Sequence, residues 1–229
     1  MKLQKETSSS QAEHGRWYDD ACGTAFAMEL IGERWSLLVV RELMLGPVRF
    51  TDLRQALPGI SAKVLTERLA GLEQAGVVER TALPPPARVQ LYGLTPWGYM
   101  AEPVIQELGR WAARSVRHDP TLPLSPVSLM MSFRTMLDRE RAHEVEADVG
   151  FVVGSQTFRA RLSGGTMPIV REGIEGAQAV FGASEAMPFA AHFYRKMPVS
   201  EVLGMEFSGD AELAARFVDL FHLPPKADG

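Results

Sequence analysis

Residues 59–80, GISAKVLTERLAGLEQAGVVER, decide the fold of the first half of the chain. Leucines recur in this stretch at the i, i+4 and i+7 spacing of a helix with one buried face: Leu65, Leu69 and Leu72. Ser61 stands where a helix N-cap is expected, and Gly76 stands where the helix should end. We therefore predict an amphipathic helix between them, with Lys63 and Glu67 on the side opposite the leucines.

The segments on either side of this helix add further elements in a definite order. Helices are expected at 22–31, 33–45 and 51–57, the last closed by Pro58-Gly59. After Gly76 come strands at 77–83 and 88–94 with a proline-rich tip, then a helix over 96–116 that Pro103 should kink. A helix-turn-helix pair followed by a hairpin predicts a winged helix-turn-helix domain.

This order of elements predicts a DNA-binding face. In a helix-turn-helix the second helix enters the major groove, and its first residues contact bases or phosphates. Basic and hydroxyl side chains suit phosphate, whereas a carboxylate can accept from cytosine. The candidate contacts, which include one on the wing, are Arg49, Thr51, Ser61, Lys63, Val64, Thr66, Glu67, Arg68 and Arg88. The alternative is a winged helix that serves as a protein-interaction module.

The sequence from residue 22 onward also resembles a known family. The stretches that carry the likeness are CGTAFAMELIGERWSLLVVRELMLGPVRFTDLRQALPGISAKVLTERLAGLEQAGVVER and then PPPARVQLYGLTPWG. Over residues 20–117 the chain is similar to HxlR-type transcriptional regulators, a branch of the MarR-like winged-helix group. The resemblance implies a homodimer on a pseudo-palindromic operator in double-stranded DNA, with half-sites about 34–36 Å apart. Ala87, inserted before Arg88, departs from the family pattern at the wing.

The helix expected over 96–116 carries an apolar stripe that a single small domain would struggle to cover. We interpret the stripe as a dimer seam, because the resemblance implies dimer contacts from the first and last helices. Packing inside the domain is the alternative. The candidate dimer contacts are Trp17, Tyr18, Ile105, Leu108 and Trp111.

Cys22 is the single cysteine, which excludes an intrachain disulfide and fits a reducing cytoplasm. Some HxlR-type regulators sense oxidants or electrophiles through a cysteine near this position, so the resemblance suggests redox sensing. A helix N-terminus helps to lower the pKa of a thiol, as reactivity requires. Buried, the same thiol would be an inert small hydrophobe. Both interpretations of Cys22 stay open.

The composition fits two globular domains. The chain has 229 residues, of which 46% are hydrophobic and 23% charged, and no apolar run reaches the length of a membrane span. Segment 1–16 is polar and lacks the apolar core of a secretory signal, so we expect a flexible start and a cytoplasmic protein. The net charge of -4 belongs to the second half: residues 1–118 hold 14 basic and 13 acidic residues, and residues 119–229 hold 10 and 15.

Residues 118–127 are rich in proline and predict a linker between a winged-helix domain over 17–117 and a second domain over 128–229. The second domain should be α+β, with one antiparallel sheet covered by helices. Its end, ASEAMPFAAHFYRKMPVSEVLGMEFSGDAELAARFVDLF, is similar to the sterol-carrier-protein-2 fold, which implies an apolar ligand between sheet and helices. The candidate pocket residues are Met130, Phe133, Met136, Phe151, Phe158, Met167, Phe181, Met187 and Phe193. Dimer or partner packing is the alternative for this domain.

The sequence shows no arrangement typical of catalysis. Histidines lack metal-ligand spacing, and SGGT at 163–166 lacks the Gly-Lys-Ser/Thr ending of a phosphate loop. We therefore expect no catalytic residue, no metal and no cofactor. The sequence predicts a homodimeric DNA-binding regulator tuned by a small apolar ligand. The alternatives are a lipid carrier that dimerises through its winged helix and a redox sensor acting through Cys22.

Overall fold

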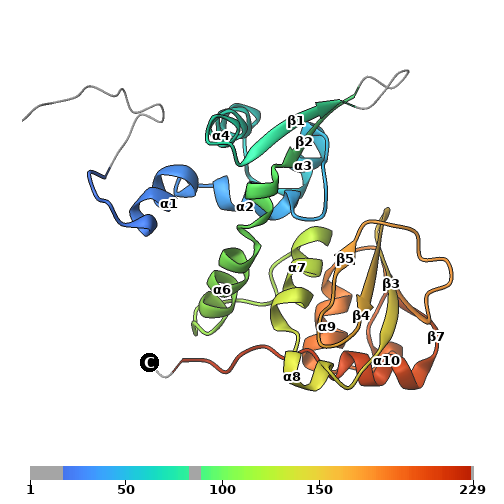
Figure 1. Ribbon diagram of the computed structural model, residues 1–229. Helices are drawn as coiled ribbons and strands as arrows, with labels where there is room; N and C mark the ends of the chain where they lie inside the picture. The colour runs from blue at the N-terminus through green and yellow to red at the C-terminus, as the bar shows by residue number, and fades with distance from the viewer. Residues whose placement is uncertain (1–17, 83–88, 228–229) are drawn as a thin grey trace, which may run out of the picture.

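The structure is a computed structural model, which describes residues 18–82 and 89–227. The first half is helical with a small hairpin, and the second half is a five-stranded sheet flanked by helices (Figure 1). The elements of the first half are α1 (Gly23–Ile31), α2 (Ser36–Leu43), α3 (Phe50–Ala56), α4 (Ala62–Gln74), β1 (Val78–Ala82), β2 (Gln90–Leu94), α5 (Pro96–Tyr99) and α6 (Glu102–Ala113). The predicted order of a winged helix-turn-helix is confirmed.

Helix α4 forms as its sequence predicts. Ser61 caps it, since its Oγ accepts a hydrogen bond of 3.2 Å from the backbone N–H of Val64. The inward face of α4 is almost wholly buried and consists of Leu65, Leu69 and Leu72. Beyond the helix, Gly76 takes a φ of +72°, a left-handed conformation that glycine adopts without a Cβ clash.

Helix α2 begins at Ser36, later than the sequence predicts, because the backbone at Trp35 is not helical. Trp35 adopts a φ of +80°, outside the right-handed helical region. This conformation costs a non-glycine residue about 1–3 kcal/mol, so the surrounding packing must hold it. The Trp35 ring lies beside Gly59, where an added Cβ would come within 3.8 Å of the ring. The strained residue therefore places its indole against the turn between α3 and α4.

The helix predicted over 96–116 is broken into two helices. Thr95 caps α5, since its Oγ1 accepts a hydrogen bond of 3.0 Å from the N–H of Gly98. Helix α5 ends at Tyr99, and α6 starts at Glu102. Pro103 then falls in the first turn of α6, where its missing N–H leaves no helical hydrogen bond unmade. The expected kink at Pro103 is wrong: the chain breaks before this residue.

The second half is a mixed sheet with helices packed on it. Its elements are α7 (Pro126–Met136), α8 (Arg139–Ala142), β3 (Ala147–Val153), β4 (Gln156–Leu162), β5 (Ile169–Val170), β6 (Ala179–Ala183), α9 (Met187–Arg195), the 3-10 turn η1 (Val199–Glu201), β7 (Met205–Gly209) and α10 (Ala211–Val218). The strand order is β5-β4-β3-β6-β7. The α+β class is confirmed, but the expectation of an antiparallel sheet is wrong because β3 and β6 run parallel. The connection from β3 to β6 runs through β4, β5 and residues 171–178, which makes it long enough for the crossover that parallel neighbours require.

Phenylalanine rings fill the space between the sheet and the helices α7, α9 and α10. Phe133 of α7 lies 4.5 Å from Phe193 of α9 and 5.4 Å from Phe151 of β3, measured between ring centroids. Phe217 of α10 lies 6.4 Å from Phe151. Six of the predicted pocket residues are buried in this core: Met130, Phe133, Phe151, Phe158, Phe181 and Phe193. Their role in binding a ligand stays a prediction.

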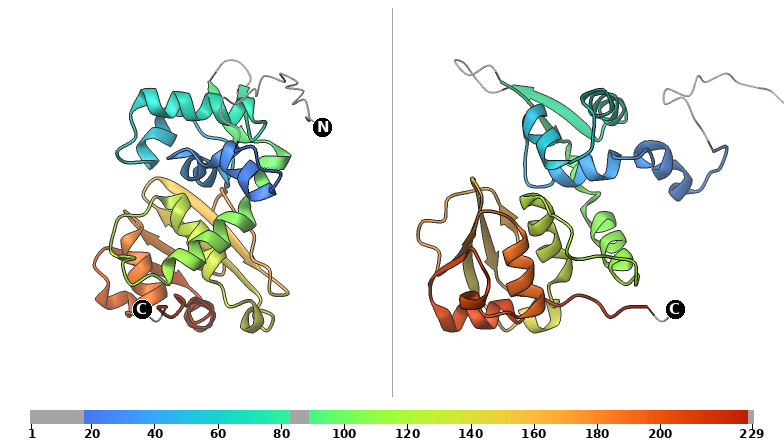
Figure 2. Two further views of the ribbon diagram at one scale, coloured as in Figure 1. Left: turned by 90° about the vertical axis from the view of Figure 1, so that its left-hand side faces the viewer. Right: turned by 180° about the vertical axis from the view of Figure 1, so that it is seen from behind.

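The two halves meet where α7 packs against α2 and α6 (Figure 2). Ser125 donates through its Oγ to Oε1 of Glu42 in α2, at 2.7 Å. Arg134 of α7 forms an ion pair of 2.8 Å with Glu102 of α6. Ser125 also caps α7 by accepting from the N–H of Ser128 at 2.9 Å. Helix α7 therefore starts inside the segment predicted as the linker, and the connection between the halves is held by side chains.

Candidate nucleic-acid interface

Helices α3 and α4 form the helix-turn-helix pair, joined by residues 57–61. Gly59 in this turn has a φ of +93°, and the neighbouring Ile60 is buried. Together with the cap at Ser61, the turn sets where α4 begins. The first turns of α4 are left at the surface, where Lys63 and Thr66 are exposed.

Lys63 is a highly accessible cation of the predicted set. Its side chain is 86% exposed, and its Nζ lies 3.9 Å from Oε1 of Glu67. An exposed pair at that distance contributes little, so both groups can exchange the contact for a ligand. Arg49, at the N-cap position of α3, and Thr51 in its first turn are also exposed. Six of the predicted contacts therefore lie at the surface of the pair: Arg49, Thr51, Ser61, Lys63, Thr66 and Glu67.

The two hydroxyls on α4 differ in what they can still bind. The Oγ of Ser61 already accepts from Val64, so its O–H remains able to donate to a phosphate. The Oγ1 of Thr66 donates to the carbonyl of Ala62 at 2.9 Å, so it can only accept from an incoming group. In this rotamer Thr66 suits an amino group on a base edge. Val64 is half-buried against the core and offers only part of its methyl surface.

Arg68 is held by a contact that the sequence did not reveal. Its Nη2 lies 3.4 Å from Oε2 of Glu33, and its side chain is only 23% exposed. Glu33 lies in the connection between α1 and α2. The structure therefore gives Arg68 a role in fixing α4 against this connection, and its predicted contact with DNA stays a prediction.

Arg54 is a surface cation that the sequence interpretation missed. It lies in the last turn of α3 and is exposed. Within residues 18–82 and 89–227, Arg54 forms no ion pair, and neither does Arg49. Its place directly after Leu53 gave the only signal in the sequence, since the residue next to a buried helical position tends to face solvent.

The wing is a two-stranded ladder in which β1 pairs with β2 from Val78↔Leu94 to Ala82↔Gln90. Arg80 on β1 lies over the ring of Tyr92, 5.6 Å from its centroid, and forms an ion pair of 2.8 Å with Glu73. The charge of Arg80 is thus largely balanced by Glu73. The predicted wing contact Arg88 lies outside the described residues, so its role stays a prediction.

Helix α6 presents an apolar stripe to solvent. The exposed members are Val104, Leu108 and Trp111, the last with 72% of its surface exposed. Ile105, also predicted as a dimer contact, is half-buried and faces a cavity on another side of the helix. Tyr18 is exposed ahead of α1, and Trp17 lies outside the described residues. An exposed patch of large apolar side chains on one helix is typical of an interaction surface.

Cys22 is exposed at the N-cap position of α1. Its side chain makes no capping hydrogen bond, but the backbone N–H groups of Thr24 and Ala25 approach the sulfur. These N–H groups favour the thiolate and lower the pKa of Cys22, with Thr24 contributing most. The structure thus supports the exposed interpretation of Cys22 over the buried one.

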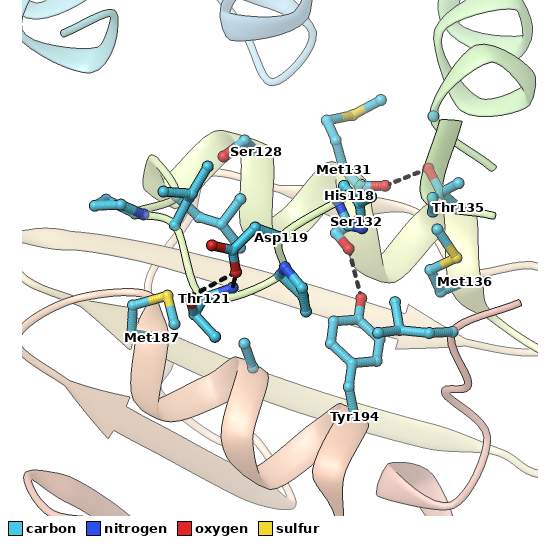
Figure 3. A pocket seen from close by; sticks show the side chains of 18 of the residues that line it. His118, Asp119, Thr121, Ser128, Met131, Ser132, Thr135, Met136, Met187 and Tyr194 are labelled. Carbon is cyan, nitrogen blue, oxygen red and sulfur yellow. Dashed lines mark hydrogen bonds between the residues drawn. The ribbon is translucent and has the colours of Figure 1, made fainter. Parts of the chain in front are cut away.

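A cavity of about 660 Å³ lies between α6, the connecting segment 117–124, α7 and α9 (Figure 3). Two of the predicted pocket residues, Met136 and Met187, line it. Met167 lines a smaller cavity of about 380 Å³ beside Glu102 and Arg134. A third cavity, of about 690 Å³, lies between the helix-turn-helix and the second half and includes Arg171. The cavity that contains Met136 and Met187 therefore lies beside α7 and α9, on the side that faces α6.

Two kinds of site are absent from the part of the chain that the structure describes. No group of three or more His, Cys, Asp or Glu side chains comes together as metal ligands would. Likewise, none of the described helices has both the length and the apolar composition needed to traverse a bilayer.

Comparisons with known proteins agree with the geometry of the first half. The model of the HxlR-like helix-turn-helix family matches residues 30–120. The uncharacterized HTH-type transcriptional regulator YvaP of Bacillus subtilis is 38% identical over 96 residues, which are 42% of this chain and 86% of that protein. The HTH-type transcriptional regulator YodB of the same organism is 43% identical over 86 residues, 38% of this chain and 77% of that protein.

Among solved structures, the reduced form of the transcriptional regulator YodB from B. subtilis is 38% identical and has a TM-score of 0.40. The match covers 44% of this chain and all of that one. Since the present chain covers 86% of a relative that is 38% identical to it, the relationship extends over nearly a whole regulator. The chain belongs to the HxlR-like helix-turn-helix family of transcriptional regulators.

Proposed function

We propose that the chain is a homodimeric, sequence-specific DNA-binding regulator that reads a pseudo-palindromic operator with α4. The observation that carries the proposal is the exposed N-terminal half of α4 within a complete helix-turn-helix. Lys63 contacts phosphate or guanine in this proposal, and Thr66 and Glu67 accept from base amino groups. Arg49 and Ser61 contact the phosphate backbone and thereby set the register of the helix in the groove.

We assign dimerisation to the exposed stripe of α6 together with α1. Val104, Leu108 and Trp111 form a stripe that is too apolar to favour contact with water, and regulators of this type bind DNA as pairs. A second copy of the chain is the occupant that suits the stripe, because a two-fold operator requires two recognition helices. Their separation should match about one turn of DNA, roughly 34–36 Å.

The second half is proposed to tune operator affinity by binding an apolar molecule. The likeness to the sterol-carrier-protein-2 fold stays a prediction, but the cavity between α6, α7 and α9 offers a volume within the usual range for small-molecule sites. A ligand changes the operator affinity only if it binds one arrangement of the two halves better than another. The mechanism is therefore a shift in population.

The test is selection of fragments of the source genome by the full-length protein at several salt concentrations. We expect enrichment of one inverted-repeat site, with binding that weakens steeply as salt rises because phosphate contacts release counterions. The inverted repeat would also report the dimer. An absence of enrichment at about 50 mM salt, with or without added medium-chain fatty acid, would contradict the proposal and favour a carrier that uses its winged helix for protein contacts.

A second candidate function is sensing of electrophiles through Cys22. The observation in its favour is the exposed sulfur beside the N–H groups of Thr24 and Ala25, which lower its pKa. Helix α1 belongs to the proposed dimer surface, so a bulky adduct on Cys22 would disturb that surface. Such an adduct would therefore weaken operator binding without touching α4.

Cys22 is expected to react with diamide or a quinone faster than the same cysteine in the unfolded chain. Because its pKa is lowered, a larger thiolate fraction exists at pH 7, and the pH–rate midpoint should fall below the ordinary value of about 8.5. Stopped-flow kinetics of the native and the urea-unfolded protein measure both midpoints, and every signal belongs to Cys22, the single cysteine. Equal midpoints, or a response to diamide that survives Cys22→Ser, would remove this candidate.

A further inference from the structure

The cavity between the two halves is lined mainly by four segments, with Arg41 of α2 and Leu223 completing its wall (Figure 3). Helix α6 of the winged-helix half supplies Ile105, Gly109 and Ala113, which recur at the i, i+4, i+8 spacing of one helix face. Helices α7 and α9 supply the facing walls, and the segment 117–124 closes one side. The cavity is thus distinct from the ring-filled space between the sheet and its helices.

The body of the cavity is apolar and adaptable. Met131, Met136 and Met187 line it together with Ala190 and Ala191. Methionine side chains are flexible and polarisable, so such a wall accommodates apolar molecules of differing shape. The cavity therefore fits the carbon skeleton of a small molecule.

Uncharged polar groups mark the inner wall. The hydroxyls of Ser132 and Tyr194 lie 2.6 Å apart and form a hydrogen bond across the cavity wall (Figure 3). Burial raises the pKa of Tyr194, which keeps the phenol neutral at physiological pH. The inner wall therefore holds no anion that would repel an acidic ligand.

Cations gather where the segment 117–124 meets α9. Arg117 and Arg195 both line the cavity, and neither forms an ion pair with any residue that the structure describes. His118 lies beside them, and the one facing carboxylate is Asp119. Asp119 accepts two hydrogen bonds from Thr121 at Oδ1, of 2.9 Å from its N–H and 2.6 Å from its hydroxyl, and these bonds, with smaller effects of His118 and Arg195, lower the pKa of Asp119. Asp119 therefore balances one of the two arginines. This end of the cavity therefore has an excess of positive charge.

We propose that this cavity binds a small amphipathic carboxylate, whose apolar body lies between α6 and α9 and whose carboxylate faces Arg117 and Arg195. Two guanidinium groups that form no ion pair within the described ranges are well suited to a carboxylate, because their paired N–H donors match its two oxygens. An apolar chain with one carboxylate matches both ends of the cavity.

Helix α6 links this cavity to the proposed dimer surface. The coupling of ligand binding to DNA binding rests on the proposed function. One face of α6 lines the cavity, while another carries Val104, Leu108 and Trp111 for the second copy. The end of α6 is tied to the C-terminal segment by Lys226, whose Nζ donates to the carbonyls of Ala113 at 3.0 Å and Ser115 at 2.9 Å. A ligand between α6 and α9 therefore contacts the helix that carries the proposed dimer surface.

The test is calorimetric titration of the full-length protein, without DNA, by decanoate and by 1-decanol. We expect one decanoate per chain, bound at least tenfold more tightly than 1-decanol. Arg117→Gln/Arg195→Gln should weaken decanoate about tenfold and leave 1-decanol unchanged. Equal affinities of the wild-type protein for the two probes, or unchanged decanoate binding by the double variant, would contradict the proposed contact between the ligand carboxylate and the two arginines.

Filling the cavity tests its location. An added Cβ at Gly109 meets no atom within 4 Å, so Gly109→Leu should place its side chain in the open space and weaken both probes at least tenfold. Gly109→Ala is the matched control, and it should bind like the wild-type protein. Ala190→Leu repeats the block from the opposite wall, α9. Decanoate binding that survives both leucine variants, or no saturable binding by the wild-type protein, would overturn the site.

The operator affinity is then measured with and without decanoate. A change of tenfold or more that Gly109→Leu abolishes would support the coupling to DNA. Decanoate binding by a protein that selects no operator would refute the proposed function while supporting the cavity as a carboxylate site. Failure of the proposed function and failure of the site are thus separate outcomes.

Discussion

Phe133→Ala is expected to destabilise the second half of the chain by about 3–5 kcal/mol, the usual cost of truncating a fully buried phenylalanine. Phe133 is 0% exposed and contacts four other rings: Phe151, Phe193, Tyr194 and Phe221. Alanine would leave a cavity at the junction of β3, α7 and α9 and would remove the ring–ring contacts, so the loss should lie in the upper part of that range. Since the free energy of unfolding of a domain is only about 5–15 kcal/mol, the variant should lose much of its stability.

Urea unfolding followed by circular dichroism, with hydrogen exchange of the β3 and β6 amides, measures this loss. The tryptophans serve as an internal control, because all four precede residue 112 and report on the first half. Leu203→Ala is the matched control in the second half, as Leu203 is 96% exposed and should change stability by less than about 0.5 kcal/mol. A loss below about 1 kcal/mol for Phe133→Ala would mean that the ring cluster is loosely packed, and would favour the predicted ligand pocket between sheet and helices.

The ring cluster also shows where the sequence was sufficient and where it was not. Apolar periodicity predicted that Phe133, Phe151 and Phe193 face inward, and they do. Whether inward-facing rings leave a space depends on how α7 and α9 dock on the sheet, and no periodicity within one element contains that distance. The cavity formed instead where the segment 117–124 crosses beside α6, between parts of the chain that the sequence treats as separate domains.

At the candidate DNA interface, too, some features could be predicted from the sequence and others could not. The cap at Ser61 and the leucine spacing of α4 are local, so both could be predicted from the sequence. The partner of Arg68 could not, because Glu33 lies 35 positions earlier and reaches it only after α1 and α2 dock on α4. The strain at Trp35 belongs to the same docking, since its ring packs on the turn before α4. Nonlocal packing therefore decided which predicted cations remain free for DNA.

The difference between free and ion-paired cations decides which variant tests DNA binding. Arg54→Ala/Lys63→Ala is expected to reduce operator affinity on the order of 10²–10³-fold, because a dimer would lose four cations at the phosphate backbone. The slope of log K against log salt should fall by roughly 3 to 4, at about 0.9 for each phosphate that is no longer neutralised. Both side chains are exposed, and neither supports the core, so the fold should be unchanged. Arg68→Ala would instead break the ion pair with Glu33 and confuse binding with the position of α4.

Fluorescence anisotropy with the selected operator, at salt concentrations from about 50 to 200 mM, measures both quantities. Arg216→Ala is the matched control for Lys63→Ala, since it also removes one exposed cation but lies on α10, in the second half. A general effect of net charge would weaken binding equally in both single variants, whereas a direct role at α4 weakens only Lys63→Ala. If the double variant binds the operator within about twofold of the wild-type protein, α4 does not approach the phosphates as proposed. The cations that remain, Arg49 at the start of α3 and those on the wing, would then have to bind the phosphates, and the proposed orientation of the winged helix on DNA would be wrong.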